Sequence, residues 1–213
     1  MRQSTVLPYL VGTFGIMCSA VAVFQYYQSY RAEVAAVSLD LFAGLPNSPV
    51  ARARFAATRD QLARPRDARL WELEAERRLR LGGPNAIDSA ADALAVAAQK
   101  SPVRSSIRMR QAYVASRLKT AGADMSRRIE QWYEVAPHDV SMQTWRVTLA
   151  AREWANLRPQ ARLLIMQDAE DLCVRLGSAR VIEMFGEGGG EPRMAAALRL
   201  SRTDTKCAGY SPT

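Results

Sequence analysis

The chain has 213 residues and a formal net charge of +8 at pH 7, from 29 Lys and Arg against 21 Asp and Glu. Its 3 cysteines and 1 histidine leave almost no ligands for a zinc site, so we expect neither a metal nor a cofactor. The arginines alternate with acidic residues, as in RDARLWELEAERRLR, which is typical of a solvated helix face and not of a basic surface for nucleic acid. We therefore predict no nucleic-acid partner.

The first predicted element is an apolar helix within residues 1–30, where no charge occurs between Arg2 and Arg31. Residues 5–24 form an apolar run of about 20 residues, which at about 1.5 Å per residue covers a hydrocarbon core of roughly 30 Å. Aromatic residues suited to a membrane interface follow at once, namely Tyr26, Tyr27 and Tyr30. We predict a single-pass transmembrane anchor that contacts membrane lipids.

The direction of this anchor follows from the charges at its two ends. Arg2 and the terminal amine lie on one side, whereas Arg31 is followed by Glu33 and Asp40 on the other. By the positive-inside rule, the N-terminus is then cytoplasmic and the remaining chain lies in the periplasm of a bacterium, at its inner membrane. The alternative is a signal peptide cut within the motif at residues 20–22, which would release a secreted or periplasmic binding protein.

Beyond the apolar run, the sequence shows helical spacing and no alternating strand pattern, so we predict an all-α fold. Glycine and proline residues separate the expected helices. These cover residues 30–42, 50–63, 66–81, 86–100, 103–121, 123–135, 140–156, 159–176 and 178–185. The predicted organisation is an anchor over residues 1–30, a juxtamembrane helix and linker over 31–49, a helical domain over 50–186, and a Gly-rich linker with a weakly ordered tail over 187–213.

A repeat with a period near 35 residues is indicated by two similar phrases that end at Pro102 and Pro137. The first phrase places small or apolar residues at Ala90, Leu94 and Ala97. This pattern resembles the tetratricopeptide repeat, a helix–turn–helix unit, over about residues 66–176. The later copies depart from the pattern, and a plain helical bundle is the alternative. The resemblance implies antiparallel helix pairs that stack and leave a concave binding groove.

The sequence carries no recognisable catalytic motif. The single histidine, His138, lies in a predicted turn. The carboxylate pairs Asp168 with Asp171 and Glu72 with Glu76 share helix faces with arginines, which favours salt bridges over acid–base catalysis. The phrase GEGGGEP lacks the Lys-Ser/Thr of a phosphate-binding loop. We predict no catalytic residues and no enzyme activity, with an enzyme built from scattered Asp, Glu and Arg as the alternative.

Tryptophans give the best indication of a binding surface. Trp145 and Trp154 lie on roughly opposite sides of one predicted helix, so either one packs inside while the other anchors a partner, or neighbouring helices bury both. The predicted partner-binding residues are Trp145, Trp154, Arg146, Arg152 and Arg158. A disulfide between Cys173 and Cys207 fits an oxidising compartment, and two unpaired thiols are the alternative.

These features together predict a membrane-anchored helical-repeat interaction module. We expect it to be an accessory or scaffold subunit of a bacterial inner-membrane complex, with other proteins of that complex as partners. The phrase WANLRPQARLLIMQ is similar to segments of small anchored helical proteins that accompany surface-polysaccharide machinery. That similarity implies an envelope-polysaccharide setting.

Overall fold

A computed structural model describes residues 6–63, 65–118, 122–137, 139–177, 180, 181 and 183, with the side chains of all of these except residues 6–10, 122 and 123. Every regular element among these residues is a helix, which confirms the all-α prediction. The chain divides into two compact units, Met1–Leu81 and Gly82–Thr213. The boundary between residues 81 and 82 was not among those predicted from the sequence. The predicted boundaries at residues 30, 49 and 186 stay predictions.

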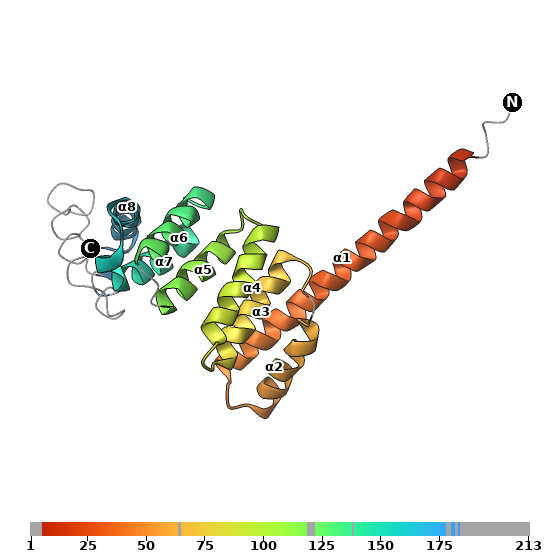
Figure 1. The fold of residues 1–213 in the computed structure, drawn as a ribbon, viewed down its shortest axis with the longest axis horizontal. Helices are drawn as coiled ribbons and strands as arrows, with labels where there is room; N and C mark the ends of the chain where they lie inside the picture. Colours follow the sequence, from red (N-terminus) through yellow and green to blue (C-terminus); the bar gives the residue numbers. More distant parts are fainter. Residues whose placement is uncertain are drawn as a thin grey trace. The chain divides into compact units, whose positions relative to one another are not determined.

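The first unit contains three helices, α1 (Val6–Gly44), α2 (Pro49–Gln61) and α3 (Ala68–Leu81) (Figure 1). Both α2 and α3 pack against α1. Ser48 caps α2, because its side chain accepts a hydrogen bond of 3.4 Å from the Ala51 N–H. Gly82 follows the end of α3 with a φ of +68°, a backbone conformation that favours glycine.

The core of this unit lies on the C-terminal half of α1. Its apolar residues recur at helical spacing on one face of α1 and meet matching positions of α2 and α3. They are Ala32, Ala35, Leu39, Phe55, Leu62, Leu70 and Leu73. The rings of Phe42 and Phe55 stack at a centroid distance of 4.2 Å beside this cluster. Residues predicted to form a juxtamembrane helix and linker therefore supply the packing surface of a folded unit.

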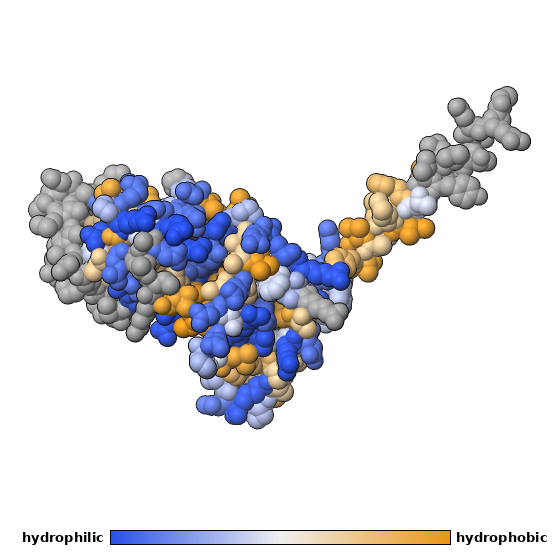
Figure 2. Space-filling model, viewed as in Figure 1, coloured by the Kyte–Doolittle hydropathy of each residue, from blue (hydrophilic) through white to orange (hydrophobic). Residues whose placement is uncertain are grey.

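The N-terminal half of α1 has a different environment, because its large apolar side chains are exposed. The face of this half that is in view is mostly apolar (Figure 2). Ile16 is 73% exposed, whereas Gln28, where packing begins, is 7% exposed. Within the described residues, no helix combines the length and the apolar character needed to cross a membrane. The structure therefore gives no support to the predicted transmembrane helix, whose run at residues 5–24 starts outside the described residues.

The second unit contains α4 (Ala86–Lys100), α5 (Ser105–Arg117), α6 (Gly122–Val135), α7 (Val140–Arg152) and α8 (Pro159–Leu176). Helix α5 packs against α4 and α6, and α7 packs against α8. Between these pairs, α5 contacts α7 and α6 contacts α8, which gives two layers (Figure 1). This arrangement is compatible with a helical-repeat fold.

Small and large apolar residues alternate in the core of the second unit. Alanines with no exposed surface allow the helix backbones to approach closely, and Trp132, Met125 and Ile129 fill the space between them. The residues Ala90, Leu94 and Ala97, which carried the repeat resemblance, are all buried. The two helices of that best-matching copy, α3 and α4, belong to different units.

The described helices agree with the predicted ones within a few residues, except at the end of α7. A helix over residues 140–156 was predicted, but α7 ends at Arg152 and a short 3-10 helix, η1 (Trp154–Asn156), follows. Arg158 precedes Pro159 and adopts an extended backbone with ψ of 156°, so the helix has to end before it. The predicted helix at residues 178–185 and the predicted tail lie wholly or largely outside the described residues.

Candidate functional site

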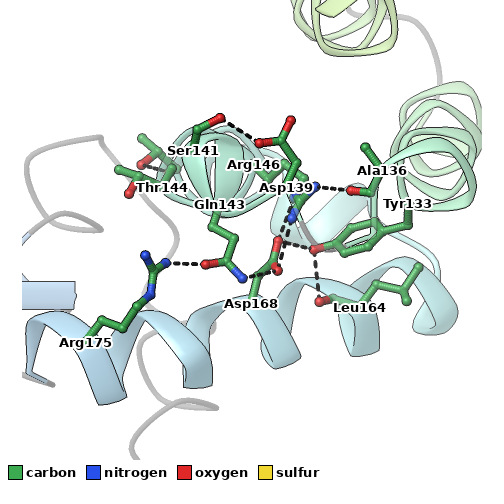
Figure 3. Close-up of polar contacts among 11 residues, drawn as sticks. Tyr133, Ala136, Asp139, Ser141, Gln143, Thr144, Arg146, Leu164, Asp168 and Arg175 are labelled. Atoms are coloured by element: carbon green, nitrogen blue, oxygen red, sulfur yellow. Dashed lines mark hydrogen bonds and ion pairs between the residues drawn. The ribbon is translucent and has the colours of Figure 1, made fainter. Parts of the chain in front are cut away.

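A buried ionic cluster joins α6, α7 and α8 at the carboxylate of Asp168 (Figure 3). Arg146 donates from Nε to Oδ2 at 2.6 Å and from Nη2 to Oδ1 at 3.2 Å. Gln143 Nε2 donates to Oδ1 at 3.0 Å, and the Tyr133 hydroxyl donates to Oδ2 at 2.5 Å. Four donors from two helices therefore satisfy one buried carboxylate on a third.

The guanidinium of Arg146 is also enclosed by aromatic rings. It lies 4.5 Å from the ring centroid of Tyr133 and 5.3 Å from that of Trp132, and its Nη1 donates to the Ala136 carbonyl oxygen at 2.9 Å. Arg146 is 1% exposed. We predicted this arginine to contact a partner, but the structure places it in the interior, where a buried guanidinium needs a carboxylate. Its counterion is 22 positions away on another helix and had no signal in the sequence.

Burial raises the pKa of Tyr133 well above its usual value, and the hydrogen bond to Asp168 raises it further. The hydroxyl therefore stays protonated and continues to donate to the carboxylate. Because the folded-state pKa lies above the unfolded one, Tyr133 contributes full stability below about pH 10, and this contribution falls as the pH rises further.

We expect Tyr133→Phe to reduce the alkaline loss of stability. Above pH 10 the free energy of unfolding of the wild-type protein should fall by up to about 1.4 kcal/mol per pH unit through Tyr133 alone, and the variant lacks this ionisable group. Urea unfolding at several pH values between 8 and 11 measures the difference in slope. Equal slopes for the two proteins would contradict a raised Tyr133 pKa.

A cleft of about 470 Å³ lies beside the cluster, between α6 and α8. Its acidic lining residues are Glu130, Glu134, Asp168 and Asp171. Tyr133 also lines it, but a tyrosine held protonated does not act as a base. Among the described residues, no group of three or more His, Cys, Asp or Glu side chains is placed to hold a metal ion. The hydrogen bonds of Asp168 to residues of α6 and α7 hold these three helices against one another.

A second polar surface, here called the aromatic–arginine face, is formed by α5 and α7. The Tyr113 and Trp145 rings meet across these helices, and spacings of three, four and seven positions put Arg110 and Arg117 on the Tyr113 side of α5 and Arg152 on the Trp145 side of α7. The Tyr113 and Trp145 rings are 6.2 Å apart, and Trp145 packs at 5.5 Å on the buried Trp132. Tyr113 is 36% exposed, Trp145 is half-buried, and Arg117 and Arg152 are exposed. Two aromatic rings and three arginines thus share one surface.

The charge of this face follows from the composition of its two helices. Neither SSIRMRQAYVASR (α5) nor VSMQTWRVTLAAR (α7) contains an acidic residue. The other layer carries both signs of charge, with three acids and two arginines on α6 and three acids and two arginines on α8. The two layers therefore differ in charge, and the aromatic–arginine face is cationic.

The other predicted binding residues are scattered. Trp154 is buried, with the Arg162 guanidinium 5.5 Å from its ring centroid. Arg158 is exposed at the start of α8, and its backbone N–H donates to Ser126 Oγ at 2.9 Å. Only Trp145 and Arg152 come together on one face. Cys173 is buried, and because Cys207 lies outside the described residues, their disulfide stays a prediction.

Tyr113, Arg110 and Arg117 are the surface residues that we did not predict. Their spacing of three and four positions was a signal for a shared helix side, but it did not reveal that α7 would lie alongside. Comparisons with known protein families, with characterised proteins and with solved structures found no match. Function therefore has to be inferred from the residues of this chain.

Proposed function

We propose that the protein is a membrane-anchored helical-repeat interaction module, an accessory or scaffold subunit of a bacterial inner-membrane complex. The observation that carries this proposal is the aromatic–arginine face. Trp, Tyr and Arg are the residues that most often anchor protein interfaces, and here they lie together on one layer of helices. The interior polar groups of the same unit are used for packing, which favours binding over catalysis as the activity of this unit.

The stacked helix pairs of the second unit support the repeat assignment within this proposal. Contacts of α5 with α7 and of α6 with α8 relate one pair to the next, as stacked repeats require. We assign these pairs to degenerate, tetratricopeptide-like repeats. Such a layered array presents side chains from neighbouring helices on one continuous surface, which suits a positioning or scaffolding role.

Although no described helix has the length and apolar character of a membrane span, the exposed apolar side chains of α1 are the reason for proposing an anchor. Exposed apolar side chains gain free energy in an apolar surrounding, and a bilayer supplies one. At the C-terminal end of this stretch, the Arg31 guanidinium lies 5.7 Å from the Tyr27 ring and the Arg66 guanidinium 5.4 Å from the Phe24 ring. Paired aromatic and arginine side chains suit the membrane interface. In this proposal the N-terminus is cytoplasmic, and the chain that follows the apolar stretch of α1 is periplasmic.

The double variant Phe14→Arg/Val21→Arg tests the anchor. Each arginine at the centre of a membrane helix costs roughly 2.5–3.5 kcal/mol, so we expect the variant to leave the membrane fraction on carbonate extraction while the wild type remains. Val50→Arg, at an exposed position of α2, is the matched control and should behave as wild type. An extractable wild-type protein, or an intact mass that lacks residues 1–22, would contradict the anchor.

Purification of the full-length protein in mild detergent through a C-terminal tag tests the scaffold role. We expect other membrane proteins to co-purify in fixed proportion, because a scaffold subunit holds them through lasting contacts. Mass spectrometry identifies and quantifies these proteins, with a tagged unrelated membrane protein as the control. Recovery of the protein alone would count against a scaffold subunit.

A further inference from the structure

We propose that the aromatic–arginine face binds an acidic segment of a partner protein, one that also carries an apolar side chain. The inference rests on the proposed interaction function and adds the chemistry of the partner. The face offers two kinds of contact side by side, namely arginines that pair with carboxylates and rings that cover an apolar group.

Charge complementarity selects the acidic partner. Arg117 and Arg152 are exposed at the C-terminal ends of α5 and α7, and the two helices contain no carboxylate of their own. A guanidinium binds a carboxylate through two parallel N–H donors, so arginine is better suited than lysine to recognise Asp or Glu. A basic segment would meet the arginines of this face and is therefore disfavoured.

The rings select a segment that is not purely acidic. Trp145 is held between Tyr113 on its outer side and Trp132 beneath it, at centroid distances of 6.2 Å and 5.5 Å. Because Trp132 is 0% exposed, it fixes the position of Trp145 before any partner arrives. An aromatic side chain that is already ordered loses little entropy on binding. A leucine or phenylalanine of the partner can cover the exposed part of this ring pair.

The spacing of the arginines gives the length of the segment. Arg110 and Arg117 are seven positions apart on α5, which is about 10.5 Å along the helix. An extended peptide covers this distance in about three residues. The geometry therefore fits two acidic residues three positions apart, with the apolar side chain between them.

Binding is measured by fluorescence anisotropy on the full-length protein in detergent. The probe is a labelled acidic peptide with one central phenylalanine, and its counterpart carries lysine at every acidic position. We expect the acidic peptide to bind, more weakly as salt is added, and the lysine peptide not to bind. Trp145→Ala and the double variant Arg117→Gln/Arg152→Gln should each weaken binding by about tenfold or more.

Arg158→Gln is the matched control, because Arg158 is an exposed arginine outside the face, and it should leave the affinity unchanged. The double arginine variant changes exposed side chains only, so it tests the face even if Trp145→Ala unfolds the unit. Four results would overturn the inference. They are equal binding of both peptides, affinity unchanged in the face variants, preference for an oligonucleotide or anionic vesicles, and self-association of the protein that these variants abolish.

Failure of this inference is distinguishable from failure of the proposed function. If partners co-purify with wild type and with both face variants alike, the scaffold role stands and the face is not its binding site. If the acidic peptide binds as expected but no membrane protein co-purifies, the face binds acidic segments and the scaffold role is wrong.

Discussion

Arg146→Met is expected to destabilise the second unit by about 3–5 kcal/mol, because it leaves the buried carboxylate of Asp168 without its counterion. The double variant Arg146→Met/Asp168→Leu removes both charges and should recover most of this loss. Urea unfolding followed by tryptophan fluorescence measures both. The fluorescence reports mainly on the second unit, which contains Trp132, Trp145 and Trp154 of the 4 tryptophans in the chain.

Arg127→Met is the control for the buried pair. Arg127 is bonded to Asp124 at 3.4 Å on the same helix, and its side chain is 60% exposed, so its loss should cost less than about 1 kcal/mol. If Arg146→Met had as small an effect as Arg127→Met, the ionic cluster would not hold α6, α7 and α8 together. A double variant no more stable than the single one would show that the charge left behind is not the main cost.

Trp132→Ala is expected to cost about 3–5 kcal/mol, since it removes the largest fully buried side chain of the described residues and leaves a cavity. Trp132→Phe should cost clearly less. It keeps a ring beside Arg146 and Trp145, and it removes an indole N–H that has no hydrogen-bond acceptor among the described residues. Thermal unfolding followed by circular dichroism compares the two variants.

Trp132→Phe also separates stability from binding. Because Trp132 supports Trp145 from beneath, even a folded Phe variant should bind the acidic peptide more weakly than wild type. The control is Arg162→Gln, which alters the surroundings of Trp154 and does not touch the aromatic–arginine face. Alanine and phenylalanine variants of equal stability would contradict the packing role of the indole ring.

Local features of the sequence predicted the helices well. Predicted helices over 86–100 and 159–176 coincide with α4 and α8, because Gly and Pro residues at their ends mark where a helix can start or stop. The prediction that Trp145 and Trp154 share one helix was wrong, because α7 ends at Arg152 and Trp154 begins η1; Trp145 is half-buried and Trp154 is buried. Helix boundaries depend on residues that are close together in the chain, so they can be predicted from the sequence alone.

Tertiary features were less predictable for a physical reason. The burial of Arg146 depends on Asp168, and the aromatic–arginine face depends on Tyr113 of a different helix from Trp145. Helical periodicity predicts which side of a helix is buried, but it does not predict which helices pack side by side. The packing of α2 and α3 on α1 was unpredictable for the same reason. The spacing of Ala32, Ala35 and Leu39 indicates an apolar face on α1, but it does not indicate which helices cover that face.

The central claim is that the aromatic–arginine face holds a membrane partner. The most direct measurement repeats the detergent purification with wild type, Arg158→Gln and Arg117→Gln/Arg152→Gln, and quantifies the co-purifying membrane proteins against the tagged protein. The account predicts equal recovery with wild type and Arg158→Gln, and recovery lower by about tenfold or more with the double variant. Equal recovery with all three proteins, or no co-purifying protein with any of them, would contradict it.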